Sequence, residues 1–265
     1  MIKRCLQSDK DRILAYIGPD YPRCLYLYLD LLRYGIESET IEVYLQQEED
    51  SITSVFLKYY SCLHVFSRDD RFDAAELADF FCEGRFSMLY CASRTAERVF
   101  AALPGSVKAK AAVTNGWVAQ IRSVDKQPRG LAVPAKDKDF EQITRLIFDD
   151  EDIGRSYQYD ALAKQLEERS REAYARNLVI RKDDLVIAHA CTNAEMDGIA
   201  VVAELIVRKE YQRQGYASEI WRELCRELLS EGKEVYSFYF SKESQALHKH
   251  IGFFEICEWT KIVIA

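Results

Sequence analysis

The sequence predicts an α/β (α+β) protein in which helices flank a mixed central β-sheet. Segments with helical periodicity alternate along the chain with segments rich in β-branched and aromatic residues. The segment Ile199–Val207 is almost continuously apolar, which is typical of a strand buried on both faces in the middle of a sheet. With 265 residues and 48% apolar content, the chain suits two domains that each bury a core.

The first half opens with two expected helices, and two expected strands follow them. Gly18, Pro19 and Pro22 separate the helices, and Gly35 ends the second one. The helices expected in this half are Lys10–Tyr16, Cys24–Tyr34, Phe72–Cys82 and Ser93–Leu103. The expected extended segments are Ile41–Leu45, Ser51–Ser67, Phe86–Cys91 and a pair of strands over Val107–Ile121.

A change in composition marks the expected domain boundary. Residues 122–138 mix charge, Pro and Gly with little amphipathic pattern. We therefore expect an N-terminal α+β domain over residues 1–125, a linker over residues 126–138 and a C-terminal domain over residues 139–265. No internal repeat is visible at a fixed period.

The second half alternates helices and strands around the apolar segment Ile199–Val207. The expected helices are Phe140–Phe148, Tyr159–Tyr174, residues 217–230 and a short helix that begins at Ser241 and closes in Gly252. The expected strands are Leu178–Arg181, Val186–Thr192, Ile199–Val207 and Val235–Phe240.

Charge and cysteine usage exclude several classes of protein. The formal net charge is −7, with −1 before residue 130 and −6 after it, so neither half offers the basic surface that nucleic acids need. No apolar run approaches the roughly 20 residues of a membrane span, and the start of the sequence lacks an apolar signal region. We therefore expect a cytoplasmic protein that binds neither nucleic acid nor membrane.

The eight cysteines are scattered, without a CxxC pair, and most lie in apolar segments. This usage predicts buried free thiols in a reducing compartment. His189 and Cys191 would point to one face of a strand, but we expect neither a metal nor a catalytic thiol there. The four histidines form no cluster with metal-ligand spacing, so no metal is expected.

The segment after Ile199–Val207 carries the chemistry. A buried strand that leads through a short loop into a helix creates an anion site, because the first helical N–H groups and the helix dipole can hold a pyrophosphate. Gly215 allows close approach of a ligand to the backbone, and Ala217 keeps the helix near the strand. One glycine before a helix is by itself a weak signal.

The sequence from Gln212 to Phe253 makes the prediction of an anion site more specific. Residues Gln212–Ala217 match the pattern (Gln or Arg)-x-x-Gly-x-(Gly or Ala) at each specified position. Residues Ser241–Phe253 resemble a second cofactor segment that ends in Gly-Phe. Residues 135–265 thus resemble the GNAT superfamily of acyl-CoA-dependent N-acyltransferases, and the chain looks closest to members with an additional N-terminal domain.

The resemblance implies an enzyme that transfers acetyl from acetyl-CoA to a primary amine of a small molecule or peptide by direct attack in a ternary complex. It implies that the backbone of Leu205–Val207 binds pantetheine, which requires Val235–Phe240 to splay away. The cofactor-binding residues it implies are Leu205, Ile206, Val207, Gln212, Arg213, Gln214, Gly215, Tyr216, Ala217, Ser218, Ser241 and Ser244.

Two side chains are the expected catalytic residues. Glu204 is the only charge inside the buried strand and would be the general base, or would form an ion pair with an arginine of a neighbouring strand. His248 stands where the family commonly has the Tyr that protonates the departing CoA thiolate, and it would act as acid or only pack against the cofactor. Tyr236 and Tyr239 are alternative acids.

The N-terminal half has no second phosphate-loop pattern. Its order of helices and strands looks like the opening of a GNAT domain, so we expect either a degenerate GNAT-like domain that helps to form the acceptor pocket or an unrelated α+β cap. For the whole chain, the alternatives to an enzyme are a non-catalytic acyl-CoA-binding or sensing module and a protein-interaction module. The acceptor amine and the oligomeric state stay open.

Overall fold

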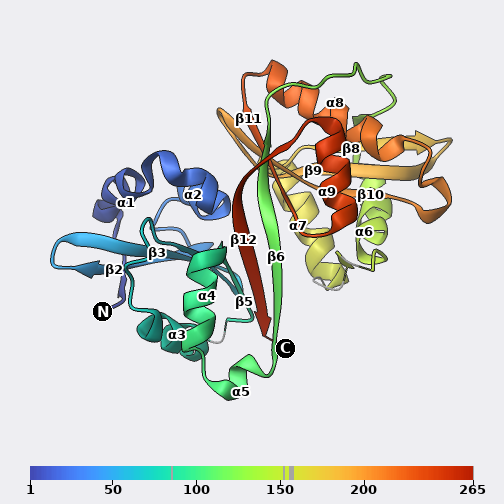
Figure 1. Cartoon of the computed structure of the whole chain (residues 1–265). Coiled ribbons are helices and arrows are strands. Elements are labelled where there is room, and N and C mark those ends of the chain that lie inside the picture. The colour runs from blue at the N-terminus through green and yellow to red at the C-terminus, as the bar shows by residue number, and fades with distance from the viewer. Residues whose placement is uncertain (85, 152, 155–157, 265) are drawn as a thin grey trace. The chain divides into compact units, whose positions relative to one another are not determined.

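The computed structural model describes residues 1–84, 86–151, 153–154 and 158–264. The chain forms two compact units (Figure 1). The first unit comprises Met1–Val118 and Glu255–Ala265, and the second comprises Ala119–Phe254. Both units contain a β-sheet flanked by helices, which confirms the predicted mixed α/β class.

The first unit contains five α-helices among its described residues. They are α1 (Lys10–Ile17), α2 (Leu25–Tyr34), α3 (Ala74–Glu83), α4 (Ser93–Ala102) and the single turn α5 (Gly105–Lys108), with the 3-10 helices η1 (Gln7–Asp9) and η2 (Gly18–Cys24). Its strands lie side by side in the order β1 (Lys3–Arg4), β2 (Ile41–Glu48), β3 (Ser51–Tyr59), β4 (Cys62–Phe66), β5 (Met88–Ala92) and β12 (Phe254–Ile264). Strand β6 (Ala111–Ile121) runs from the first unit into the second.

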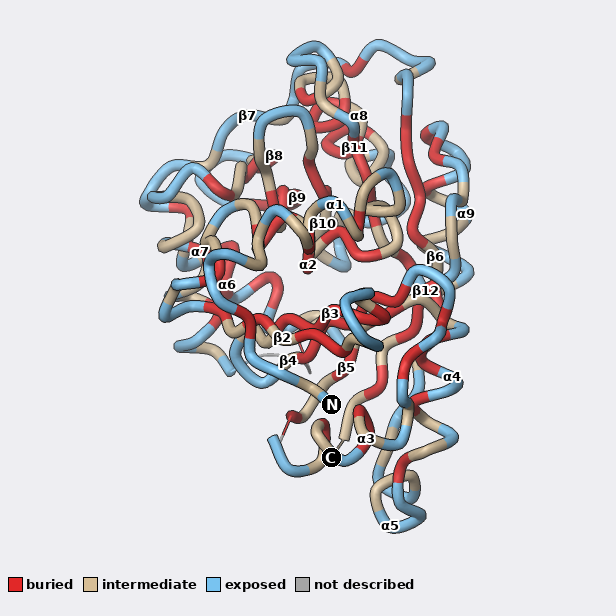
Figure 2. Tube along the Cα trace, turned by 90° about the vertical axis from the view of Figure 1, so that its left-hand side faces the viewer, coloured by how far each residue is buried: buried red, intermediate tan, exposed pale blue. Residues whose placement is uncertain are grey.

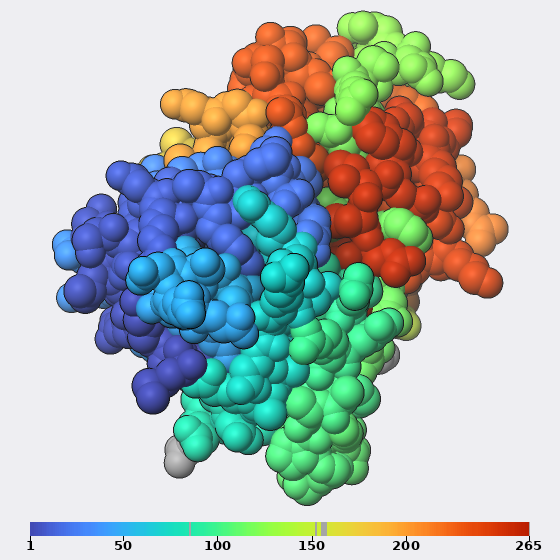
Figure 3. All heavy atoms as spheres, turned by 60° about the vertical axis from the view of Figure 1, so that its left-hand side comes forward, coloured from blue at the N-terminus to red at the C-terminus, as the bar shows by residue number. Residues whose placement is uncertain are grey.

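Helices cover both faces of this first sheet. Alternate residues of β2 and β3, such as Val43 and Val55, pack against Ile13 and Leu27 of α1 and α2. The intervening residues, such as Phe56, pack in a second cluster with side chains of α3 and α4. Helices α1 and α2 are the dark blue surface of Figure 3, and the buried strands between the helical layers are red in Figure 2. The period-2 alternation of the strands therefore supplies two cores.

The second unit repeats this plan. Its helices are α6 (Phe140–Phe148), α7 (Tyr159–Arg171), α8 (Tyr216–Ser230) and α9 (Lys242–Ile251), with the 3-10 helices η3 (Asp137–Asp139) and η5 (Lys209–Tyr211). Its strands lie in the order β11 (Glu234–Tyr239), β10 (Ile199–Val207), β9 (Leu185–Met196), β8 (Asn177–Lys182) and β7 (Val133–Pro134). Helices α6 and α7 pack on Val179, Val186 and Ile206, whereas α8 packs on β8 to β11 and α9 packs on α8.

Apart from the single turn α5, the two halves of the chain share one order of elements, from β1 to β6 and from β7 to β12: strand, two helices, three strands, helix, strand, helix and strand. The likeness extends to detail. The backbone N–H of Leu6 donates to Asp9 Oδ2 at 2.9 Å, and that of Lys136 donates to Asp139 Oδ2 at 2.6 Å, each in a 3-10 turn that precedes the first helix. The repeat is structural and was not visible as a sequence period, because packing preserves the burial pattern rather than the residues.

The compact units are divided differently from the expected domains. Residues 119–125 group with the second unit, and 255–265 group with the first, because β12 pairs antiparallel with β5 from Trp259–Ala92 to Val263–Met88. The segment expected as a linker contains β7 and η3. The expected strand pair over Val107–Ile121 is wrong, since α5 and the single strand β6 occupy this region.

Candidate functional site

Strands β10 and β11 separate part of the way along their length. They pair in parallel from Ile199–Glu234 to Val202–Ser237. The ladder ends there, although β10 continues to Val207 and β11 to Tyr239. The backbone of β10 beyond Val202 therefore has no β11 partner in the ladder, and an extended ligand could hydrogen-bond there as an added strand. This is the separation that the predicted pantetheine site requires.

A β-bulge lies at the same place in β10. The register with β9 shifts between Ala203–Cys191 and Ile206–His189, and Glu204 has a φ of 52°. A positive φ is uncommon for a residue other than glycine, and such bulges re-aim side chains. The Glu204 side chain is half-buried, and its Oε2 lies 3.4 Å from the Sγ of Cys191.

The start of helix α8 leaves backbone donors open. Gly215 is the N-cap with a φ of 86°, and the first helical hydrogen bond runs from Glu219 N to Gly215 O at 3.0 Å. The N–H groups of Tyr216, Ala217 and Ser218 thus precede the helical ladder, and no side chain among the described residues caps them. A Cβ added to Gly215 would meet no atom within 4 Å, so the space beside this residue is open.

Two glutamines of the predicted phosphate loop hold the loop itself. Gln212 Nε2 donates to Val207 O at 3.0 Å, and Gln214 Nε2 donates to Glu210 O at 3.2 Å. Arg213 between them has a φ of 59°. The side chains of Gln212 and Gln214 thus fix the path from β10 to α8.

The predicted acid His248 forms hydrogen bonds within the protein through both ring nitrogens. It is 4% exposed, and burial lowers its pKa to about 4, so the ring is neutral near pH 7. Its Nδ1 lies 2.7 Å from Ser244 O, which only accepts, so Nδ1 carries the proton and Nε2 accepts from the Ser237 hydroxyl at 2.8 Å. Both ring nitrogens are therefore engaged within the protein, joining β11 to α9.

The neighbouring residues have distinct surroundings. Ser241 caps α9, because its Oγ accepts from Ser244 N at 3.1 Å. The Tyr236 hydroxyl donates to Glu234 and receives a hydrogen bond from Gln120 Nε2 at 3.2 Å. Tyr239 lies beyond the last paired residue of β11, with its ring 4.9 Å from that of His248.

One residue of the site was not assigned a role from the sequence. Cys191 is 2% exposed and pairs with Ala203 across the β9–β10 ladder, so its thiol reaches the bulge. The signal in the sequence was its place two residues after His189, which puts both on one strand face. All eight cysteines are free, and five are buried, which confirms the prediction of free thiols.

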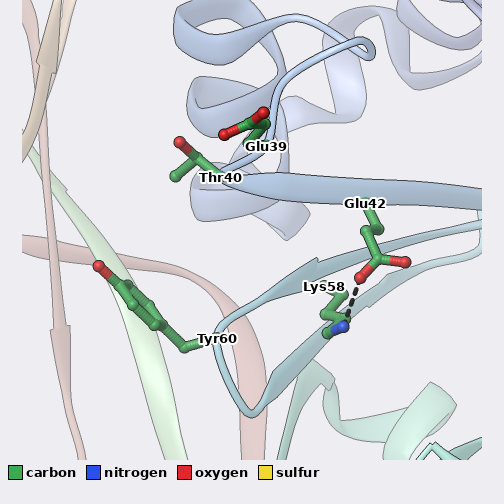
Figure 4. A pocket seen from close by; sticks show the side chains of 5 residues that line it. All are labelled: Glu39, Thr40, Glu42, Lys58 and Tyr60. Atoms are coloured by element: carbon green, nitrogen blue, oxygen red, sulfur yellow. Dashed lines mark hydrogen bonds and ion pairs between the residues drawn. The ribbon is translucent and has the colours of Figure 1, made fainter.

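Other features do not form part of this site. A pocket of about 420 Å³ in the first unit is lined by Glu39, Thr40, Glu42, Lys58 and Tyr60 (Figure 4). Lys58 and Glu42 point toward each other there and form an ion pair. Within the described part of the chain, no group of three His, Cys, Asp or Glu side chains could hold a metal ion, and no helix is long and apolar enough to cross a bilayer.

Comparison with known proteins finds a family match within the second unit. Residues 140–253 match the model of the Acetyltransferase (GNAT) family. The matched segment includes the pattern at Gln212–Ala217, and the match supports an acyl-CoA-dependent acyltransferase. No curated protein sequence matches the chain.

Solved structures resemble the chain over nearly its whole length. A Drosophila protein gives a TM-score of 0.68 at 13% identity, covering 100% of this chain and 98% of its own. A GCN5-related N-acetyltransferase from Sphaerobacter thermophilus gives 0.63 at 12%, covering 99% and 94%. A tandem GNAT protein from the clavulanic acid biosynthesis pathway gives 0.60 at 10%, covering 100% and 98%. At such identities the likeness shows the fold alone.

Proposed function

We propose that the protein is an acetyl-CoA-dependent N-acetyltransferase that transfers acetyl directly to a primary amine within a ternary complex. The observation that carries this proposal is the coincidence of two open backbone sites in one GNAT domain. The β10–β11 ladder ends at Val202–Ser237, and the N-cap Gly215 offers no side chain to the N-terminal amides of α8. An extended ligand with a pyrophosphate satisfies both kinds of donor.

The residues divide the binding of CoA between them. The N–H groups of Tyr216, Ala217 and Ser218 would hold the pyrophosphate, and the backbone of Leu205–Val207 would hold the pantetheine. Gly215 keeps the approach open, since it has no side chain and its φ of 86° favours glycine. This binding of CoA would use backbone amides and a helix dipole rather than a basic surface. A net charge of −7 therefore does not prevent the protein from binding a polyanion.

Glu204 is our proposed general base. The bulge sets this carboxylate at the point where β10 and β11 separate, next to the proposed thioester position. There it would take a proton from the incoming ammonium group and leave a neutral amine to attack the thioester carbonyl. The acidic second half favours a cationic acceptor. The unpaired cysteines fit a reducing compartment, and we place the enzyme in the cytoplasm.

We assign the proton on the departing CoA sulfur to Tyr239 rather than to His248. The neutral ring of His248 already donates its one N–H to Ser244 O. Tyr236 lies in the paired part of β11, opposite Val201. Tyr239 ends β11 where the strand has left the ladder. A thiol ionises near pH 8.5, so the demand on this acid is small.

The first test measures release of free CoA from acetyl-CoA across a panel of small amines and peptides. We expect turnover with at least one amine, no CoA release in its absence, and no acetyl group left on the protein. Glu204→Gln should lower kcat by about 100-fold or more while acetyl-CoA still binds. An acetylated enzyme, or full activity of Glu204→Gln, would contradict direct transfer with Glu204 as base.

A non-catalytic acyl-CoA sensor is the second candidate, and the internal hydrogen bonds of His248 favour it. A sensor would bind acetyl-CoA with no turnover on any acceptor. The bulky change Gly215→Trp should abolish acetyl-CoA binding whether the protein is an enzyme or a sensor. If Gly215→Trp still binds acetyl-CoA, or if the unaltered protein does not bind it, both the enzyme and the sensor are ruled out.

A further inference from the structure

The bulge in β10 brings the carboxylate of Glu204 to a buried thiol. Cys191 faces Ala203 in the ladder, so its Sγ position is fixed by the two strands. Glu204 follows Ala203 directly, and its positive φ accompanies a side chain that lies against Cys191. Without the extra residue of the bulge, consecutive side chains at positions 203 and 204 would point to opposite faces of the sheet.

The thiol has one proton and three acceptors within reach. Its Sγ lies 3.4 Å from Glu204 Oε2, 3.5 Å from Asn193 Oδ1 and 3.7 Å from Ala203 O. The carboxylate is the nearest of these and the one that carries charge, so it is the strongest acceptor. Burial, together with the nearby charge of Glu204, raises the pKa of Cys191 well above its usual value. The thiol therefore keeps its proton at working pH and remains a donor.

We propose that Cys191 is a positioning residue whose S–H group donates to the Glu204 carboxylate and holds it, ionised, at the mouth of the separated strands. This inference rests on the proposed function for its catalytic consequence, whereas the hydrogen bond itself does not. A thiol is a neutral donor, so it orients the carboxylate without itself adding a positive charge beside it. S–H is a weak donor, so the effect on Glu204 is modest.

Several other groups surround this pair. On β9, His189 pairs with Ile206, and burial lowers its pKa to about 3, so it is neutral. On α7, Arg169 contributes a positive charge that acts to lower the pKa of Cys191. These groups stay in place in every variant below, so a change confined to position 191 reports on the thiol.

The experiment compares Cys191→Ala and Cys191→Ser in the full chain. Cys225→Ala is the matched control, because Cys225 is also a fully buried free cysteine but lies in α8. The first readout is the pH titration of the Glu204 side-chain carboxyl by ¹³C NMR, assigned by its loss in Glu204→Gln. The second is the acidic limb of kcat/KM against pH.

We expect Cys191→Ala to raise the carboxyl titration midpoint by about half a pH unit. Cys191→Ser should lie between the alanine variant and the unaltered protein, because a hydroxyl is still a donor but is shorter. Cys225→Ala should leave the midpoint unchanged, and the KM for acetyl-CoA should not move in any variant. The acidic limb of kcat/KM should shift in the same direction as the titration midpoint of the Glu204 carboxyl.

The outcomes separate the two proposals. An unmoved carboxyl midpoint in Cys191→Ala, or an equal shift in Cys225→Ala, would overturn the positioning role. If the titration midpoint of the Glu204 carboxyl shifts but the acidic limb of kcat/KM does not, the hydrogen bond is supported and Glu204 is not the base. Turnover that is absent in the unaltered protein leaves the NMR readout available, so the hydrogen bond is still tested.

Discussion

Helices α3 and α8 hold the same place in the order of their units, yet their N-termini differ. In the first unit Asp73 is the N-cap of α3, and its carboxylate accepts from Ala75 N and Glu76 N at 3.0 Å each. In the second unit Gly215 is the N-cap of α8 and offers no side chain. The same position in the order of elements thus carries an acidic N-cap in the first unit and a glycine in the second.

The loops that lead to these helices show the same contrast. Asp70, before α3, has a φ of 59°, and its carboxylate accepts from Thr95 Oγ1 at 2.7 Å and lies 3.3 Å from Arg94 Nε. The loop is thus tied by its own acidic side chain to the start of α4. In the loop before α8, glutamine amides bond to backbone carbonyls instead. A shared topology therefore does not imply a shared ligand.

The largest expected effect comes from making α8 resemble α3. Gly215→Asp would place a carboxylate where the pyrophosphate is proposed to bind, and we expect acetyl-CoA to bind about 100-fold more weakly, which is about 2.8 kcal/mol. Gly215→Asn is the matched control, because Asn has the same shape without the charge and tolerates a positive φ. It should lose about tenfold or less. Calorimetric titration measures both.

The dependence of acetyl-CoA affinity on salt separates the effect of charge from that of backbone strain. The difference between the Asp and Asn variants should shrink as ionic strength rises, since repulsion between charges near the surface is screened. Equal affinities of the two variants at low salt would mean that backbone strain alone explains the loss. The helix start would then not be the pyrophosphate site.

The second expected effect is a difference in acid sensitivity between the units. Burial lowers the pKa of His189 to about 3 and of His248 to about 4 in the second unit, whereas in the first it lowers that of His64 to about 4. Below about pH 6.5 the unfolded chain takes up these protons first, so stability falls as the pH drops from 6.5 toward 4. At about pH 5 each histidine costs up to about 2 kcal/mol.

Hydrogen exchange between about pH 7.5 and 5, corrected for intrinsic rates, measures this loss in each unit. Protection in β9 and α8 should fall more than in β3 and α3. His248→Gln should reduce the pH dependence of the second unit, because an amide can donate and accept without titrating. Equal losses in both units would instead show that they unfold together.

The smallest expected effect is the loss of the carboxylate cap in the first unit. Asp73→Ala should destabilise α3 by about 1 kcal/mol, because two backbone donors lose their partner. Asp73→Asn keeps an acceptor and should cost less. Urea unfolding followed by exchange in α3 measures the change. Acetyl-CoA affinity should stay the same in both variants, and a loss of affinity would show that the first unit takes part in cofactor binding.

The sequence by itself determined the features that depend on local pattern. The phosphate-loop residues Gln212–Ala217, the helix behind them and the charged residue in a buried strand all follow from residue type and spacing. So do the helices that flank each sheet, since amphipathic periodicity reports which face is buried. These predictions needed no knowledge of which strand lies beside which.

Only the tertiary structure decided the features that depend on distant partners. The end of the β10–β11 ladder, the pairing of β12 with β5 and the contact between Cys191 and Glu204 each join residues far apart in the chain. His248 was expected as an acid from its position in a pattern, but burial lowers its pKa, and its Nε2 is held by the Ser237 hydroxyl on another element. Spacing along a chain fixes the face of a residue, whereas the partner, the desolvation and the proton it carries are fixed by what packs against that face.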